Sequence, residues 1–282
     1  MARRKRQDTL TVDDVTDWWR TEIVDIAPGV IRVRGYAIED LIGRISFPAM
    51  IWLVTRGQLP TDAEAELLGA VLVAGVDHGP QAPAVAIARM AATCGVGLNN
   101  AMASGVNVLG DVHGGAGQQC MVLIADIAGR EKMGAPLGEA VAAALKDFRA
   151  ENGRFVPGFG HRFHPTDPRA KRLSEMIRSA ARKGTVSGRY LAIGEAIQKR
   201  LSADSGRPLP MNIDGITAVV LSELGFPAEL GRGIFILSRS VGICAHAFEQ
   251  SRQGGRIKGP TPPAAGFRYT GAKPRKLKAK RK

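Results

Sequence analysis

The sequence predicts an all-α fold. Much of the chain between residues 37 and 250 divides into segments of helical length, with apolar residues at helical spacing. Aromatic residues make up only 5% of the chain, whereas alanine, leucine, valine and isoleucine abound, which favours helix-on-helix packing. The alternation of strands and helices that is typical of a parallel α/β fold is absent. No internal repeat is present.

The N-terminal part combines a short helix with a hairpin. Residues 9–19 begin with acidic side chains and predict a short helix. Residues 23–33 alternate apolar and polar side chains around Pro28-Gly29, which predicts a short hairpin. Residues 37–56 predict one helix, with Pro48 near its first turns.

The remaining helices follow from start signals and periodicity. Thr61 and Glu64 form a capping-box pattern, which predicts that a helix begins here and continues to about Val76. Small residues throughout residues 83–109 predict closely packed, buried helices. The later predicted helices are residues 115–128, 137–150, 168–182, 186–201, 212–224 and 229–250.

The net charge of +13 lies mostly in two tails. Residues 3–6 supply four basic side chains and residues 269–282 supply seven, with no acidic residue in either segment. Without these eleven, the basic residues nearly balance the 26 acidic ones. We therefore expect residues 1–7 and 269–282 to be solvated basic tails. Specific nucleic-acid binding is not expected, because it needs a basic face on the folded body.

Other classes of protein are disfavoured. No apolar run reaches the roughly 18 residues of a membrane span, and the N-terminus does not resemble a signal peptide. The three cysteines, Cys94, Cys120 and Cys244, lack the spacing of a zinc site and predict small buried thiols in a reducing compartment. We expect a cytoplasmic protein with no membrane partner and no metal.

Chemistry-bearing residues concentrate in glycine- and proline-flanked stretches. His78, His113 and His161 lie in such stretches, and Asp214 follows in MNIDGITAV. Glycine lets the backbone approach a ligand, and histidine can donate or pass a proton at neutral pH. From the residues alone, His78 could instead cap a helix end and Asp214 could be a helix N-cap. Arg239, in an apolar helix, could belong to a buried ion pair.

Seven sequence stretches indicate a family more specifically than any single motif, because they occur in the order and approximate spacing of that family's motifs. Together they resemble the citrate synthase family, in its short citryl-CoA lyase-like form, over residues 34–271. The stretches are VRGYAIEDL, RGQLPTDAE, DHGPQAP, LGDVHGGAG, VPGFGHRFHPTDPRA, NIDGITAVVLSELGFP and FILSRSVGICAHAFEQ.

The resemblance implies a role for each matching residue. Asp214 matches the base that removes the α-proton of a thioester, and His113 matches the residue that hydrogen-bonds the thioester carbonyl. His161 matches the residue that polarises the carbonyl of the acceptor. His78, Arg169 and Arg239 match residues that bind the 2-oxo acid, the two arginines through its carboxylates. His164 and His246 are expected to be structural.

The resemblance also implies a coenzyme A site on the glycine-rich loop. Its residues are Val156, Gly158, Phe159, Gly160 and Arg162. Lys171 and Arg172 are near enough in sequence to meet phosphates. Between His161 and Arg169 the chain is one residue shorter than the common family pattern, so the nucleotide contacts are expected to differ.

A second departure concerns the end of the chain. Many family members carry Arg-Pro there, supplied across a dimer interface to a substrate carboxylate. Here Gly259 precedes Pro260, with Arg256 and Lys258 close by. Either one of these neighbouring basic residues replaces the arginine, or the acceptor pocket lacks one group that binds a carboxylate. Losing such a charge-assisted hydrogen bond would cost about 1.5–3 kcal/mol of binding free energy.

The resemblance implies a two-lobed helical enzyme with the active site in a cleft between its lobes. The large domain is expected to hold residues 8–113 and 221–268, and the small domain residues 114–220. A homodimer is implied. No tightly bound cofactor is implied, because the coenzyme A thioester is a substrate.

The reaction direction stays open at the level of sequence. A citrate synthase-type enzyme would join acetyl-CoA to oxaloacetate, giving citrate or citryl-CoA through a thioester enolate. A citryl-CoA lyase would run the same steps backward. A different class of protein, a non-catalytic binding protein on the same fold, is disfavoured because His113, His161 and Asp214 are all present.

Overall fold

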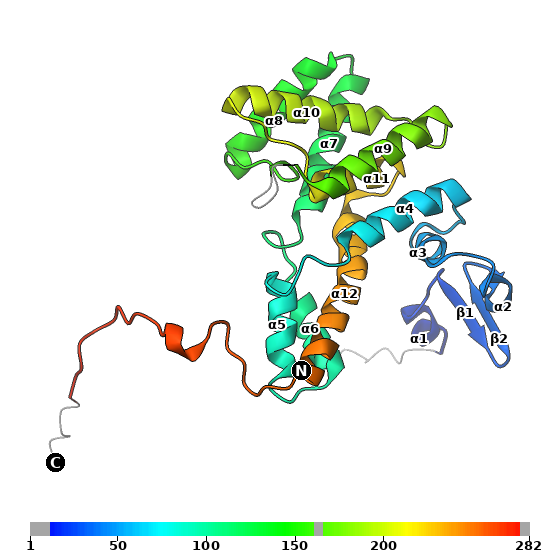
Figure 1. Cartoon of the computed structure of the whole chain (residues 1–282). Coiled ribbons are helices and arrows are strands. Elements are labelled where there is room, and N and C mark those ends of the chain that lie inside the picture. Colours follow the sequence, from blue (N-terminus) through cyan, green and yellow to red (C-terminus); the bar gives the residue numbers. More distant parts are fainter. Residues whose placement is uncertain (1–11, 161–165, 277–282) are drawn as a thin grey trace, which may run out of the picture. The chain divides into compact units, whose positions relative to one another are not determined.

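The computed structural model describes residues 12–160 and 166–276. The chain separates into two compact units, one formed by residues 1–75 and 114–238 and the other by residues 76–113 and 239–282. Helices dominate both units, which confirms the predicted all-α fold (Figure 1).

The N-terminal segment of the first unit contains the one sheet of the described residues. Helix α1 (Val12–Trp18) precedes three antiparallel strands in the order β1-β2-β3. The predicted hairpin is β1 (Val24–Ala27) and β2 (Val30–Val33), and β3 (Tyr36–Ala37) was not predicted.

The single helix predicted for residues 37–56 is wrong. The segment forms two helices, α2 (Ile38–Leu41) and α3 (Phe47–Arg56). Gly43 lies between them at a φ of 75°, a left-handed conformation that interrupts a helix. Ser46 then starts α3 by accepting a hydrogen bond from the Ala49 N–H on its side chain.

Four helices of the first unit pack around α11 (Ile213–Glu223). Ile216, Val219 and Val220 of this helix are fully buried. Its neighbours are α4, α7, α9 and α10, and α8 packs against α7 and α10 (Figure 1). The unit's other helical bounds are α4 (Asp62–Gly75), α7 (Ala116–Lys132), α8 (Leu137–Asn152), α9 (Pro168–Arg182), α10 (Arg189–Ser205) and the start of α12 (Ala228–Gln253).

The capping box before α4 is confirmed. The Glu64 N–H donates to Thr61 Oγ1 at 3.3 Å, and the Thr61 N–H donates to Glu64 Oε2 at 2.8 Å. These reciprocal bonds satisfy two donors that the first turn of a helix leaves without partners.

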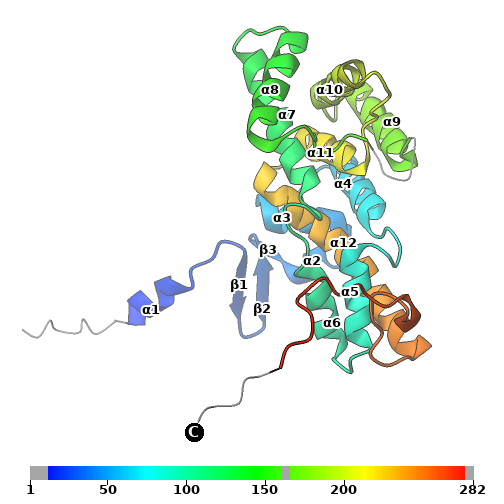
Figure 2. The same cartoon turned by 90° about the vertical axis from the view of Figure 1, so that its left-hand side faces the viewer.

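The second unit consists of α5 (Pro83–Ala92), α6 (Leu98–Val106), the rest of α12 and the C-terminal arm (Figure 2). Gly105 of α6 lies against α5, and a Cβ at this glycine would lie 2.7 Å from the Ala84 carbonyl oxygen. The close packing predicted for these helices is thus confirmed, but the predicted burial holds only in part, since Leu98 of α6 is 43% exposed. Residues 254–276 are exposed and contain only one short 3-10 helix, Pro263–Ala265.

Two further predictions concern cysteines and membranes. Cys120 is buried and Cys244 is partly buried, but Cys94 is exposed, because it lies in the turn between α5 and α6. The prediction of a buried thiol is therefore wrong for Cys94. Among the described residues, no helix has the length and apolar character to cross a bilayer.

The predicted large and small domains remain a prediction. The two units group segments that pack together, whereas the predicted domains are the two lobes of an expected cleft. Both divisions place a boundary between residues 113 and 114.

Candidate functional site

The predicted site residues fall into two sets, one in each unit. Asp214, Arg169 and the loop of Val156, Gly158, Phe159 and Gly160 belong to the first unit. His78, His113 and Arg239 belong to the second. His161 and Arg162 lie outside the described residues.

Asp214 lies in the first turn of α11, and Asn212 is the N-cap of that helix. Asn212 Oδ1 accepts hydrogen bonds from the Asp214 N–H at 2.9 Å and the Gly215 N–H at 3.2 Å. The N-cap reading of Asp214 is therefore wrong, because Asn212 already occupies the cap. The positive end of the helix dipole stabilises a carboxylate in this turn.

The same asparagine also holds the glycine-rich loop. Its amide Nδ2 donates to the Gly160 carbonyl at 2.7 Å, and its backbone N–H donates to the Gly158 carbonyl at 2.9 Å. The Gly160 N–H in turn donates to the Pro210 carbonyl at 2.7 Å. Asn212 thus fixes the candidate base and the predicted coenzyme A loop with one side chain.

Two glycines make this approach possible. Gly158 has a φ of 88°, and a Cβ there would lie 2.7 Å from the Gly215 Cα. A Cβ at Gly215 would lie within 2.3 Å of the Gly158 carbonyl oxygen. No side chain fits at either position, so the loop backbone lies directly on the first turn of α11.

Cys120 of α7 lies beneath this contact. Its Sγ would be 3.0 Å from a Cβ at Gly158. Burial, and next the charge of Asp214, raise the pKa of the Cys120 thiol to about 12. The thiol therefore stays protonated at neutral pH and serves as a small packing group.

Arg169 is held by Asp167, which sequence reasoning missed. Arg169 Nε donates to Asp167 Oδ1 at 2.9 Å and Nη2 donates to Oδ2 at 2.8 Å. Asp167 is 1% exposed and also accepts the Ile213 N–H at 3.1 Å. Burial works to raise the pKa of this carboxyl, but the bonds and charge of Arg169 leave the pKa lowered. Asp167 therefore joins the candidate carboxylate-binding arginine to the start of α11.

In the second unit, His113 accepts a hydrogen bond from the backbone of α5. The Ala84 N–H donates to His113 Nε2 at 3.2 Å. A nitrogen that accepts carries no proton, so the ring proton of the neutral imidazole lies on Nδ1. Burial, followed by the charge of Arg239, lowers the pKa of His113. Both effects favour the neutral form as a hydrogen-bond donor.

Arg239 and His78 differ in exposure. Arg239 is 6% exposed on α12, whereas His78 is exposed in the turn between α4 and α5. Since α4 ends at Gly75 and α5 begins at Pro83, His78 is not at a helix cap position. The capping interpretation of His78 therefore stays a prediction for its side chain alone.

A pocket of about 610 Å³ lies beside the glycine-rich loop. Its apolar wall includes Phe155, Val156 and Phe159, and its rim carries Arg154 and Arg207. The Arg154 guanidinium lies 4.9 Å from the centre of the Phe155 ring. Neither arginine forms an ion pair with a residue that the structure describes. Aromatic surface beside uncompensated positive charge suits a nucleotide.

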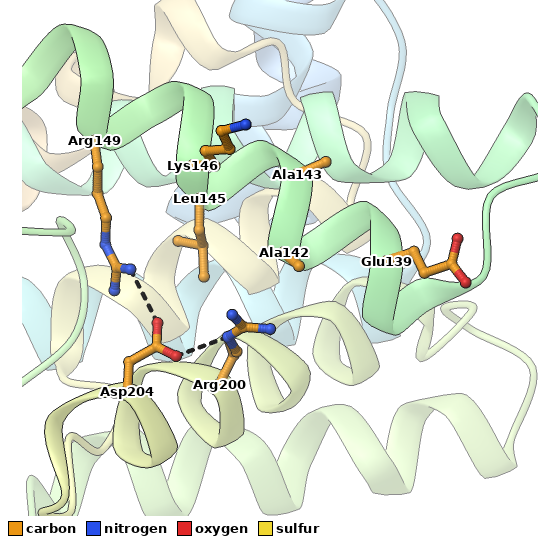
Figure 3. A pocket seen from close by; sticks show the side chains of 8 residues that line it. All are labelled: Glu139, Ala142, Ala143, Leu145, Lys146, Arg149, Arg200 and Asp204. Atoms are coloured by element: carbon orange, nitrogen blue, oxygen red, sulfur yellow. Dashed lines mark hydrogen bonds and ion pairs between the residues drawn. The ribbon is translucent and has the colours of Figure 1, made fainter.

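A second pocket lies between α8 and α10 and holds none of the predicted residues (Figure 3). Asp204 pairs with both arginines of this pocket, with Arg149 at 2.9 Å and with Arg200 at 2.8 Å. The described residues also contain no cluster of side chains suited to a metal ion.

The C-terminal arm bears on the missing arginine. Lys258 Nζ donates to Gln250 Oε1 of its own chain at 3.2 Å, and its backbone N–H donates to Thr93 Oγ1 at 2.9 Å. Arg256 is exposed. Of the two candidate replacements, Lys258 is therefore already engaged within the second unit.

Sequence comparisons point to one family. The C-terminal domain family of citrate synthase matches residues 60–261. The citrate synthase of Haloferax volcanii is 32% identical over 223 residues, which are 77% of this chain and 53% of that protein. The chain thus spans about half the length of the curated relatives it matches.

Solved structures agree. Citryl-CoA lyase from Hydrogenobacter thermophilus is 33% identical with a TM-score of 0.80, and the match covers 92% of this chain and 97% of that one. Citrate synthase from Thermoplasma acidophilum, in complex with carboxymethyl coenzyme A and oxaloacetate, shares the fold at 20% identity. Its TM-score is 0.65, with 82% of this chain and 58% of that chain covered. The chain belongs to the citrate synthase family.

Proposed function

We propose that this chain makes or breaks the carbon–carbon bond between an acyl-CoA and a 2-oxo acid, and that its reaction is the cleavage of citryl-CoA. The similarity in sequence and fold to a citryl-CoA lyase supports this direction over that of a full synthase. The observation that carries the proposal is Asn212, which holds Asp214 and the glycine-rich loop together.

The proposed steps follow from the two sets of residues. In cleavage, His161 takes the proton of the citryl hydroxyl, the carbon–carbon bond breaks, and oxaloacetate leaves. The bonding electrons pass to the thioester as an enolate, which His113 stabilises by donating its Nδ1 proton in a hydrogen bond. Asp214 returns a proton to the enolate carbon, giving acetyl-CoA. Condensation uses the same groups in reverse.

The remaining site residues are proposed to bind the 2-oxo acid. His78, Arg169 and Arg239 bind the oxo acid, and the two guanidinium groups carry the charge that its carboxylates need. Arg169 meets them with Nη1, since Nε and Nη2 bind Asp167. Closure of the two predicted domains on this site would exclude water from the enolate.

Coenzyme A lies along Val156, Gly158, Phe159, Gly160 and Arg162 in this proposal. Arg154 and Arg207 lie beside that loop, whereas Arg172 is paired with Glu175 at 3.6 Å. We assign the nucleotide phosphates to Arg154 and Arg207 because both line the pocket beside that loop. Replacing both by alanine should raise the KM of the thioester, while Arg178→Ala, an exposed control in α9, should not. An unchanged KM would remove this assignment.

A product assay tests the reaction itself. Purified protein is mixed with citryl-CoA, and separately with acetyl-CoA and oxaloacetate, while free coenzyme A and oxaloacetate are followed. We expect oxaloacetate without free coenzyme A from the first mixture. Free coenzyme A from the second mixture would show a hydrolysing synthase instead. No product from either would contradict the proposal. The homodimer and the cytoplasmic location remain predictions.

A further inference from the structure

His246 lies at the centre of a polar cluster in the second unit. Its Nε2 lies 3.2 Å from Asp77 Oδ2, and its Nδ1 lies 3.0 Å from Arg89 Nη1. Arg89 also donates to Glu249 at 2.5 Å and to Gln253 at 2.8 Å. The cluster thus joins α5 and α12 to the residue that immediately precedes His78.

The guanidinium of Arg89 determines which ring nitrogen carries the proton. An arginine only donates hydrogen bonds, so His246 Nδ1 must be the acceptor of this pair. The proton of the neutral ring is then on Nε2, where it is donated to Asp77. Each hydrogen bond from Arg89 through His246 to Asp77 Oδ2 thus joins a donor to an acceptor, whereas Asp77 Oδ1 is buried without a hydrogen-bond partner among the described residues.

Asp77 also determines the shape of the turn that contains His78, through a hydrogen bond to the backbone and through contact with α12. Its Oδ2 also accepts the Gly79 N–H at 3.1 Å, which closes the turn across His78. A Cβ at Gly242 would lie 2.3 Å from the Val76 carbonyl oxygen and 3.1 Å from Asp77 Oδ1. The turn therefore lies directly against the α12 backbone at this glycine.

The residues that hold the turn share one face of α12 with a candidate substrate ligand. Arg239, Gly242 and His246 are three and four residues apart, a spacing that places them on the same side of a helix. The face of α12 that carries Arg239 therefore also contacts Val76 and Asp77, the two residues before His78.

We propose that His246 is a positioning residue, which fixes the turn of residues 77–79 and so places His78 for the 2-oxo acid. This inference rests on the proposed function for the role of His78, but not for the geometry of the turn. It replaces the expectation that His246 is merely structural. Glutamine should substitute for it, because an amide can donate to Asp77 and accept from Arg89.

The test compares His246→Gln with His246→Ala, and uses Ser251→Ala on the exposed surface of the same helix as control. His246→Ala should raise the KM for the oxo-acid-bearing substrate by about tenfold to a hundredfold, the scale of a misplaced binding group. Its kcat should change much less. His246→Gln and Ser251→Ala should retain the KM of the unmodified protein.

Two measurements stay valid if the proposed reaction fails. Hydrogen exchange at the Gly79 amide should be faster in His246→Ala but not in His246→Gln. Nitrogen NMR of the unmodified protein should show His246 as the Nε2-protonated tautomer, even if the alanine variant does not fold. A Nδ1-protonated ring, or equal KM values for the glutamine and alanine variants, would overturn the inference.

Discussion

The two units hold their candidate site residues by different physical means. In the first unit, one asparagine and two glycines fix Asp214 and the loop through bonds to the backbone. In the second unit, side chains that can carry a charge hold the site residues. His113 lies beside Arg239, and His246 lies between Asp77 and Arg89. Backbone bonds and the space at two glycines set the first arrangement, and the same unit holds Arg169 through the Asp167 carboxylate. The second arrangement rests on side-chain hydrogen bonds and on the charge of Arg239 beside His113.

The largest effect is expected from adding one methyl group to the first unit, in the variant Gly215→Ala. In Gly215→Ala the new Cβ would collide with the Gly158 carbonyl, so the loop or α11 must shift. We expect a loss of about 1–3 kcal/mol of unfolding free energy and a large fall in kcat, measured by denaturant unfolding and steady-state kinetics. Gly138→Ala, where a Cβ meets nothing within 4 Å, is the control. Unchanged activity in Gly215→Ala would show that the contact is dispensable.

Asn212 variants separate helix capping from loop placement. Asn212→Asp keeps the oxygen that caps α11 but loses the amide that binds the Gly160 carbonyl, whereas Asn212→Ala loses both. We expect the alanine variant to lose about 0.5–2 kcal/mol of stability and the aspartate variant much less. Both should raise the KM of the thioester. If the aspartate variant kept the original KM, the loop would not need the asparagine.

The second unit should instead respond to charge. Burial and Arg239 hold the pKa of His113 below the ordinary 6.5, so the folded protein binds its proton less readily than the unfolded chain. The stability contributed by neutral His113 is therefore present above pH 6.5 and declines as the pH falls below it. Arg239→Gln should move the pKa of His113 upward, as followed by NMR titration. A downward shift would contradict the assigned cause.

The smallest effect is expected outside both sites. Removing residues 269–282 takes away seven basic side chains that follow an exposed arm. We expect kcat within about twofold of the original, as for surface changes in general. A collapse of kcat would show that the C-terminal arm completes the site.

Sequence patterns predicted what local rules determine. Helical periodicity located most helices, and the capping box at Thr61 and Glu64 was read directly. The break at Gly43 was missed, because a glycine inside an apolar run signals a helix end only once its φ is known. The residues that hold the site were missed for another reason. Asn212 and Asp167 form hydrogen bonds with residues 46 to 54 positions away in the sequence or in neighbouring turns. Such long-range hydrogen bonds depend on how the helices pack, which local sequence patterns do not show.

The central claim is that the Asp214 carboxylate removes a proton from the α-carbon of the thioester and returns it to the enolate. Hydrogen exchange at the methyl group of acetyl-CoA tests this claim most directly. Acetyl-CoA is incubated with the protein in deuterium oxide, together with an unreactive analogue of the oxo acid. We predict that Asp214→Ala slows deuterium uptake at the methyl group by about 10²–10⁴-fold, while the exposed variant Asp126→Ala does not. Uptake at the original rate in Asp214→Ala would contradict the account.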